Sequence, residues 1–126
     1  MALSLNVFKT VTKVASASPE VIYTAPIGYT GVILLAQVAN IGDISYDVTF
    51  SHQRTVSGIA VTTEIQVQTP IESKDTINLL SGKLVLESGD KLILKGNNST
   101  NLKFLASILE TLNWKWQNIL AVEKET

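Results

Sequence analysis

Few residues of this sequence have the types and spacing that catalysis requires. The single histidine, His52, lies in a polar stretch directly after a predicted strand, where a solvent-exposed turn residue is the ordinary interpretation. Serines and threonines are plentiful, but none lies in a nucleophile elbow, and there is neither a glycine-rich phosphate loop nor a pair of metal ligands at helical spacing. We therefore expect no catalytic residue, no bound cofactor and no enzymatic activity.

Two pairs of carboxylates flank predicted turns. Asp43 and Asp47 enclose one turn, and Glu87 and Asp90 enclose another. Carboxylate and backbone carbonyl oxygens are the ligands that Ca²⁺ prefers, so each pair is a candidate cation site. Turn-forming carboxylates more often bond their own backbone, and we therefore expect no metal site.

The two tryptophans near the C-terminus are the best candidates for a binding role. Trp114 and Trp116 could stack on a sugar, or they could anchor this segment on its own core or on a neighbouring copy, and we favour the anchoring role. The conformation of the segment stays open. As a strand it places Trp114 and Trp116 on one face, and as a helix it groups Trp116, Ile119 and Leu120.

Length and composition restrict the class of protein. A chain of 126 residues is the size of one domain, and the absence of cysteine excludes disulfides and cysteine-based zinc sites. A net charge of −1 excludes a strongly basic nucleic-acid binder. No stretch of about 18 uninterrupted apolar residues predicts a membrane span, and the N-terminus lacks the pattern of a secretory signal. We expect a soluble protein folded in a reducing cytoplasm.

The clearest structural pattern lies in residues 81–112. Leu84 and Leu86 alternate with Val85 and Glu87, and Leu92 and Leu94 alternate with Ile93 and Lys95. The turn-forming residues Ser88-Gly89-Asp90 separate these two runs. This pattern predicts a β-hairpin with a three-residue loop, in which Leu86 faces Leu92 and Leu84 faces Leu94. A third strand follows, with one shared face formed by Leu102, Phe104, Ala106 and Ile108.

The rest of the chain supplies further short strands. Residues 32–39 are apolar on both faces, which is typical of a central strand covered on each side, while residues 52–58 are polar and predict an exposed loop. Strands at roughly 8–12-residue spacing predict an all-β, single-domain antiparallel β-sandwich, or jelly roll, of about eight strands with extended terminal arms. We divide the chain into an N-terminal strand or arm (1–15), a sandwich core (16–112) and a C-terminal tail (113–126).

Some strand positions predicted to face outward are apolar where a sandwich normally carries polar residues. Burying such side chains would favour a homo-oligomer over a monomer. Terminal arms at residues 3–8 and 113–122 could add a strand to the open edge of a neighbour. The predicted oligomer interface comprises Val85, Ile93, Leu105, Leu109, Trp114, Trp116 and Ile119.

Four segments taken in order resemble small virion structural proteins of tailed bacteriophages, including cyanophages. They are residues 21–40, which contain a Pro-x-Gly turn before an apolar strand, and residues 69–72, 79–90 and 104–110. The resemblance implies a non-enzymatic virion component that decorates the head or belongs to the neck or tail. It implies synthesis in the host cytoplasm and contact with other virion proteins. The alternative is a receptor- or carbohydrate-binding module of a tail or head fibre, in which Trp114 and Trp116 stack on a glycan.

Overall fold

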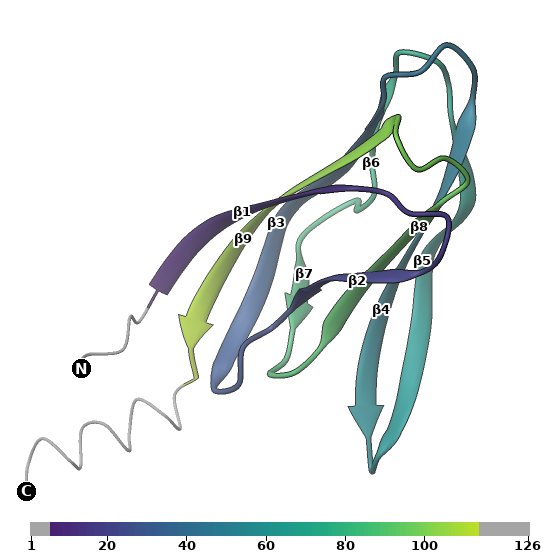
Figure 1. Ribbon diagram of the computed structural model, residues 1–126. Helices are drawn as coiled ribbons and strands as arrows, with labels where there is room; N and C mark the ends of the chain where they lie inside the picture. The colour runs from purple at the N-terminus through teal and green to yellow at the C-terminus, as the bar shows by residue number, and fades with distance from the viewer. Residues whose placement is uncertain (1–5, 114–126) are drawn as a thin grey trace, which may run out of the picture.

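The computed structural model describes residues 6–113, and every regular element within them is a β-strand (Figure 1). The nine strands follow one another with short turns between most of them, as the Gly, Pro and Asn punctuation of the sequence predicts. Their bounds are β1 (Asn6–Val14), β2 (Glu20–Thr24), β3 (Tyr29–Asn40), β4 (Tyr46–Val56), β5 (Ile59–Ile71), β6 (Thr76–Asn78), β7 (Leu84–Leu86), β8 (Lys91–Gly96) and β9 (Leu102–Leu112).

The strands form two antiparallel sheets. Sheet A has the order β1-β9-β3-β6, with β7 also paired to β3, and sheet B has the order β2-β8-β4-β5. Because β6 and β7 pair with different parts of β3, they act together as one interrupted strand. The molecule is therefore an antiparallel β-sandwich with jelly-roll topology, which confirms the predicted fold class.

Alternate residues of each strand point between the sheets and form the core. On β9 the buried set comprises Leu102, Phe104, Ala106 and Ile108, which confirms the predicted inward face of this strand. The Phe104 ring lies 5.8 Å, centroid to centroid, from the ring of Phe50 on β4 of sheet B. Contacts of this kind across the sandwich bury the apolar faces of both sheets against each other.

The predicted hairpin at residues 84–95 is wrong. β7 pairs with β3 in sheet A, whereas β8 pairs with β2 and β4 in sheet B, so the turn at residues 87–90 crosses between the sheets. Leu86 and Leu92 are both buried, but they enter the core from opposite layers. The alternation of apolar and polar residues is the same for two strands paired edge to edge and two strands packed face to face. Alternation alone therefore does not select the pairing partner.

The predicted loop at residues 52–58 is also wrong, because β4 continues to Val56 and pairs with β5 as far as Ile59. Ser57 and Gly58, both with positive φ, form the tight turn between the two strands. Residues 55–64 are exposed on both faces. The end of the β4–β5 hairpin thus extends beyond the sandwich as a two-stranded finger, visible in Figure 1.

The two ends of the described chain lie together. Asn6, the first residue of β1, pairs with Thr111 near the end of β9, and Figure 1 shows both strand ends at the same end of the sandwich. β1 is the edge strand of sheet A. Residues 1–5 and 114–126 lie outside the described part, so the predicted arms at 3–8 and 113–122 stay predictions.

Candidate assembly surface

A row of apolar side chains crosses the outer face of sheet A. Phe8 on β1 is paired with Leu109 on β9, Leu109 with Val32 on β3, and Val32 with Val85 on β7. Directly paired residues of a sheet point to the same face, so the four side chains form one continuous line. Phe8 is 74 % exposed and Val85 is 54 % exposed at the two ends of this line. We call these four residues the apolar row.

A β-bulge adds more apolar surface beside the apolar row. The pairing of β3 with β9 shifts between Ile33 and Leu35, and Leu34 and Leu35 are both more than one-third exposed. A small hollow of about 270 Å³ lies between Phe8 and Leu34, with Ser107 of β9 also lining it. Pockets for drug-sized ligands begin at about 300 Å³, so this hollow fits one large side chain better than a separate ligand.

The strand residues predicted to form an interface are not all on one surface. Leu105, Leu109 and Val85 lie on the outer face of sheet A, and two of them belong to the apolar row. Ile93 lies on β8 in sheet B, where it pairs with Val21 and Ser51, so it points to the opposite side of the sandwich. Trp114, Trp116 and Ile119 lie outside the described residues.

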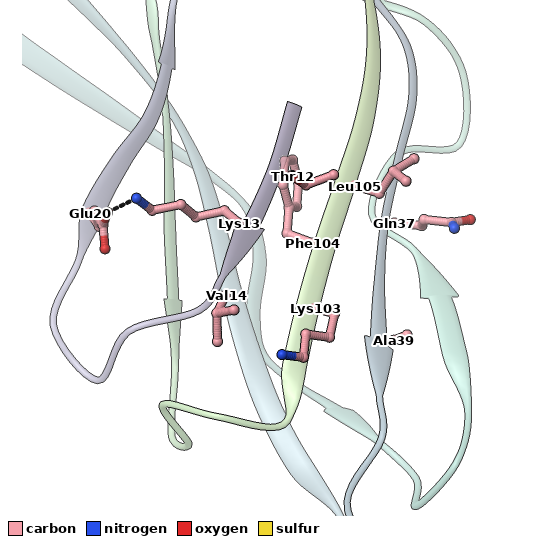
Figure 2. A pocket seen from close by; sticks show the side chains of 9 residues that line it. All are labelled: Thr12, Lys13, Val14, Glu20, Gln37, Ala39, Lys103, Phe104 and Leu105. Carbon is pink, nitrogen blue, oxygen red and sulfur yellow. Dashed lines mark ion pairs between the residues drawn. The ribbon is translucent and has the colours of Figure 1, made fainter. Parts of the chain in front are cut away.

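A larger hollow of about 800 Å³ lies at the other end of the same face (Figure 2). Two of its polar groups, Lys13 and Glu20, are already paired with each other at 2.7 Å. Among the described residues that line it, the one aromatic residue is Phe104, which is buried in the core and offers no exposed ring for sugar stacking. The residues lining it are Thr12, Lys13, Val14, Glu20, Gln37, Ala39, Lys103, Phe104 and Leu105.

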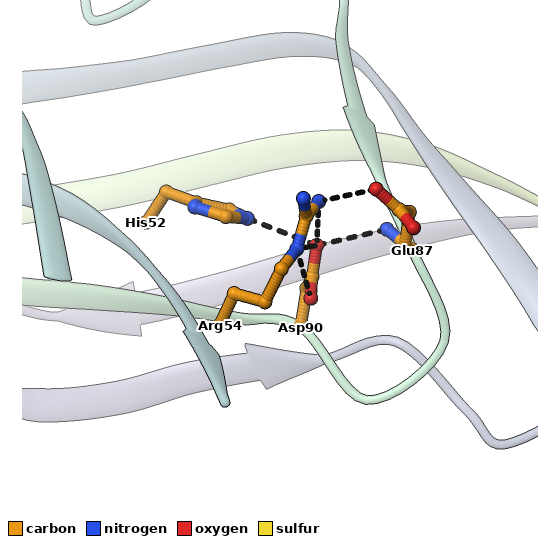
Figure 3. A network of polar contacts seen from close by, with 4 residues as sticks. All are labelled: His52, Arg54, Glu87 and Asp90. Atoms are coloured by element: carbon orange, nitrogen blue, oxygen red, sulfur yellow. Dashed lines mark hydrogen bonds and ion pairs between the residues drawn. The ribbon is translucent and has the colours of Figure 1, made fainter. Parts of the chain in front are cut away.

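His52 is not the exposed turn residue that the sequence predicts. It lies within β4, and its Nε2 atom is 3.0 Å from a carboxylate oxygen of Asp90 (Figure 3). Arg54, two residues along the same strand, donates from Nη2 to Asp90 at 2.6 Å and pairs with Glu87 at 2.8 Å. The backbone N–H of Glu87 donates to Asp90 as well. These four residues, which we call the clamp, fasten the turn between β7 and β8 to the base of the β4–β5 finger.

The clamp keeps Asp90 ionised although its side chain is only 3 % exposed. Burial by itself raises the pKa of this carboxyl, but hydrogen bonds from Arg54, from His52 and from the Glu87 backbone outweigh it and lower the pKa to about 2. Both carboxylates of the candidate cation pair Glu87 and Asp90 already form ion pairs with Arg54. Sequence reasoning missed the clamp because its two halves are more than thirty positions apart.

A second buried carboxylate lies inside the sandwich. Glu110 continues the inward face of β9, is 5 % exposed, and accepts a hydrogen bond of 2.5 Å from the hydroxyl of Tyr23 on β2. Lys9 of β1 approaches the same carboxylate at 3.2 Å. Burial and the contact with Glu110 raise the pKa of Tyr23, so the phenol remains protonated and donates. This group ties the two sheets together and is satisfied within the chain.

Within residues 6–113, His, Asp and Glu side chains form no cluster of three or more that could hold a metal ion. The same residues contain no helix of the length and apolarity needed to cross a membrane. Among the described residues, the clamp and the Tyr23–Glu110 group have their partners within the chain, and the apolar row is exposed at both of its ends.

No protein-family profile matches this sequence, and no curated protein matches it. Solved structures do share the fold. A chain of the T13 IBDV viral particle matches with a TM-score of 0.55 and 8 % identity over 87 % of this chain. This chain spans about a third of that neighbour, 32 % of its length.

A chain from the capsid of Helicobacter pylori bacteriophage KHP30 matches with a TM-score of 0.51 and 10 % identity. The match covers 86 % of this chain and 89 % of the phage chain, so the two have similar size as well as the same fold. A chain of Bacillus endospore appendages gives 16 % identity and a TM-score of 0.47 over 86 % of this chain and 88 % of the other. At these identities the likeness to the two viral chains establishes the β-sandwich architecture.

Proposed function

We propose that this chain is a non-enzymatic structural component of a tailed-bacteriophage virion, which assembles as a homo-oligomer on the head, neck or tail. The observation that carries the proposal is the apolar row. A monomer in water would leave Phe8 and Val85 largely exposed at the ends of a continuous apolar line, and contiguous apolar patches of this kind mark contacts between proteins.

The fold and the four resembling segments support the same function. Jelly rolls also occur in lectins and enzymes, so the fold alone does not choose among these functions. The KHP30 capsid chain shows that a β-sandwich of nearly this length exists in a phage capsid. In the described residues, the inner faces of both sheets form the core. The outer face of sheet A is a second apolar surface, which is available for contact with other copies or other virion proteins.

Burial of the apolar row and of the neighbouring leucines of the β3 bulge would favour assembly. Complete burial of a large apolar side chain contributes about 1.5–3 kcal/mol. Phe8 and Val85 still have more than half of their surface to bury, and Leu34 and Leu35 have more than one-third. A few kcal/mol per subunit, repeated around a closed ring, offsets part of the entropy lost when subunits associate.

Analytical ultracentrifugation of the full chain over a range of concentrations tests this function. The wild-type chain is expected to sediment as an oligomer, and a Phe8→Lys/Val85→Lys variant as a folded monomer. Ile44→Lys is the matched control, because Ile44 is 62 % exposed in the turn between β3 and β4, away from the row. A wild-type chain that is monomeric at every concentration, or a double variant that assembles normally, would overturn the proposal.

The location on the particle needs a separate experiment. Image reconstruction of a phage particle that carries this chain is expected to show sandwich-sized density on the head surface, neck or tail. Density for the outer face of sheet A should be in contact with another subunit.

A further inference from the structure

We infer that residues 114–126 of one copy cover the apolar row of a second copy. The inference rests on the proposed homo-oligomer and names the segment that makes its contact. It follows from where the described chain ends, from the residues that come next, and from the dimensions of the row.

The chain leaves sheet A beside the apolar row but pointing away from it. The backbone N–H of Asn113 donates to the carbonyl of Gly28 at 2.9 Å. The hydroxyl of Thr30 donates to the Asn113 side chain at 2.6 Å. These bonds hold β9 beside β3 up to Asn113, whereas the row crosses β9 at Leu109, behind the exit point. To bring Trp114 and Trp116 onto its own row, the chain would have to reverse directly after Asn113.

The residues that follow do not favour such a reversal. Trp114-Lys115-Trp116-Gln117 contains no Gly, Pro, Asn, Asp or Ser, the residue types that supply tight turns, and the first such residue after Asn113 is Asn118. The side-chain oxygen of Asn113 already accepts the bond from Thr30. If the segment turns no earlier than Asn118, Trp114 and Trp116 would lie beyond their own row, which is why the row of a second copy is the favoured acceptor.

The segment matches the row in length and chemistry. The row crosses four strands, so it spans about 14 Å from three inter-strand spacings. Residues 114–126 would extend about 20 Å as a helix and about 40 Å as a strand, so either conformation covers the row. Trp116 belongs to the apolar group of the segment in both cases. The hollow between Phe8 and Leu34 provides space for one large side chain of this kind.

Cross-linking tests the contact directly, because the natural chain has no cysteine. One chain carries Thr10→Cys, on the exposed outer face of β1 next to the row, and the other carries Gln117→Cys. The two chains are mixed, allowed to exchange subunits and treated with a short bismaleimide. A covalent dimer joined between positions 10 and 117 is expected, and Glu64→Cys on β5 of sheet B is the matched control that should not cross-link to position 117.

The effect of the aromatic anchor is measured on the full chain by sedimentation equilibrium. Trp116→Ser is expected to weaken self-association at least tenfold, in line with truncation of an aromatic hot spot. Lys115→Ser, one residue away, should stay within about twofold of the wild-type dissociation constant, because rim charges change affinity little.

The outcomes separate this inference from the proposed function. A wild-type chain that never oligomerises defeats both. An oligomer that forms no cross-link between positions 10 and 117 and does not respond to Trp116→Ser overturns the inference and leaves the assembly proposal standing. A chain carrying both cysteines that cross-links only within itself shows that the segment covers its own row, which also overturns the inference.

Discussion

The clamp around Asp90 makes a quantitative prediction about stability. The substitution is Asp90→Asn, which keeps the shape of the side chain but removes its charge. In the folded chain the pKa of Asp90 falls from 3.8 to about 2. One pKa unit corresponds to about 1.4 kcal/mol, so ionised Asp90 stabilises the fold by about 2 kcal/mol.

The pH range of this effect follows from the direction of the shift. Because the folded-state pKa is below the unfolded value, the stabilisation is fully present above about pH 4 and is lost as the pH falls towards 2. At pH 7 the Asp90→Asn variant is therefore expected to unfold with a free energy about 2 kcal/mol smaller than wild type. The difference between the two chains should shrink steadily between pH 4 and pH 2.

Urea denaturation followed by circular dichroism at several pH values measures both quantities. Asp43→Asn is the control, because the Asp43 side chain is 94 % exposed and its ion pair with Lys74 lies on the surface. This control should unfold like wild type at every pH. If Asp90→Asn also matched wild type at pH 7 and at pH 3, the clamp would contribute no stability and the electrostatic reasoning would be refuted.

Three further predictions concern the sandwich and the alternative function. Tyr23→Phe removes one donor from buried Glu110 and is expected to lower the free energy of unfolding by about 1–3 kcal/mol, measured by chemical denaturation. Gly31→Ala would place a methyl group 3.2 Å from the Tyr23 hydroxyl oxygen, so it should destabilise the wild type more than it destabilises the Tyr23→Phe variant in a double-mutant cycle. The chain is expected not to bind purified host polysaccharide. Binding that disappears in a Trp114→Ala/Trp116→Ala variant would instead favour the carbohydrate-binding alternative.

The two-layer fold could be predicted because the alternation of apolar and polar residues is visible within each core strand by itself. On β9, alternation alone identifies Leu102, Phe104, Ala106 and Ile108 as inward residues, and the structure buries all of them. Extending the same alternation by one step would have placed Glu110 inside as well. A glutamate on an otherwise apolar strand face therefore indicates, from the sequence alone, that a buried polar partner must exist. In the structure this partner is Tyr23.

The pairing of strands and the polar finger could not be predicted in the same way. β7 and β8 carry the alternation of a hairpin, yet the turn between them is fixed across the two sheets by long-range contacts from Arg54 and from the 25–28 turn. The end of β4 and the start of β5, residues 55–64, lie beyond the core, so neither face of this segment is buried and burial imposes no apolar period on it. For β7 and β8 the decisive partners are distant in sequence, whereas the finger is a local hairpin whose strands lack a buried face.

The two outer faces of the sandwich differ, and this difference favours sheet A as the proposed assembly surface. On sheet B the comparable row is Val21, Ile93, Ser51 and Glu64, in which two of the four positions are polar. On sheet A every position of the row is apolar, and the extra leucine of the β3 bulge lies beside it. Folding of one chain does not require this second apolar face, because the core is already closed by sheet B. Contiguous exposed apolar patches commonly mark contacts between proteins, which is why the proposed assembly through sheet A explains more of the sequence than a monomeric binding module does.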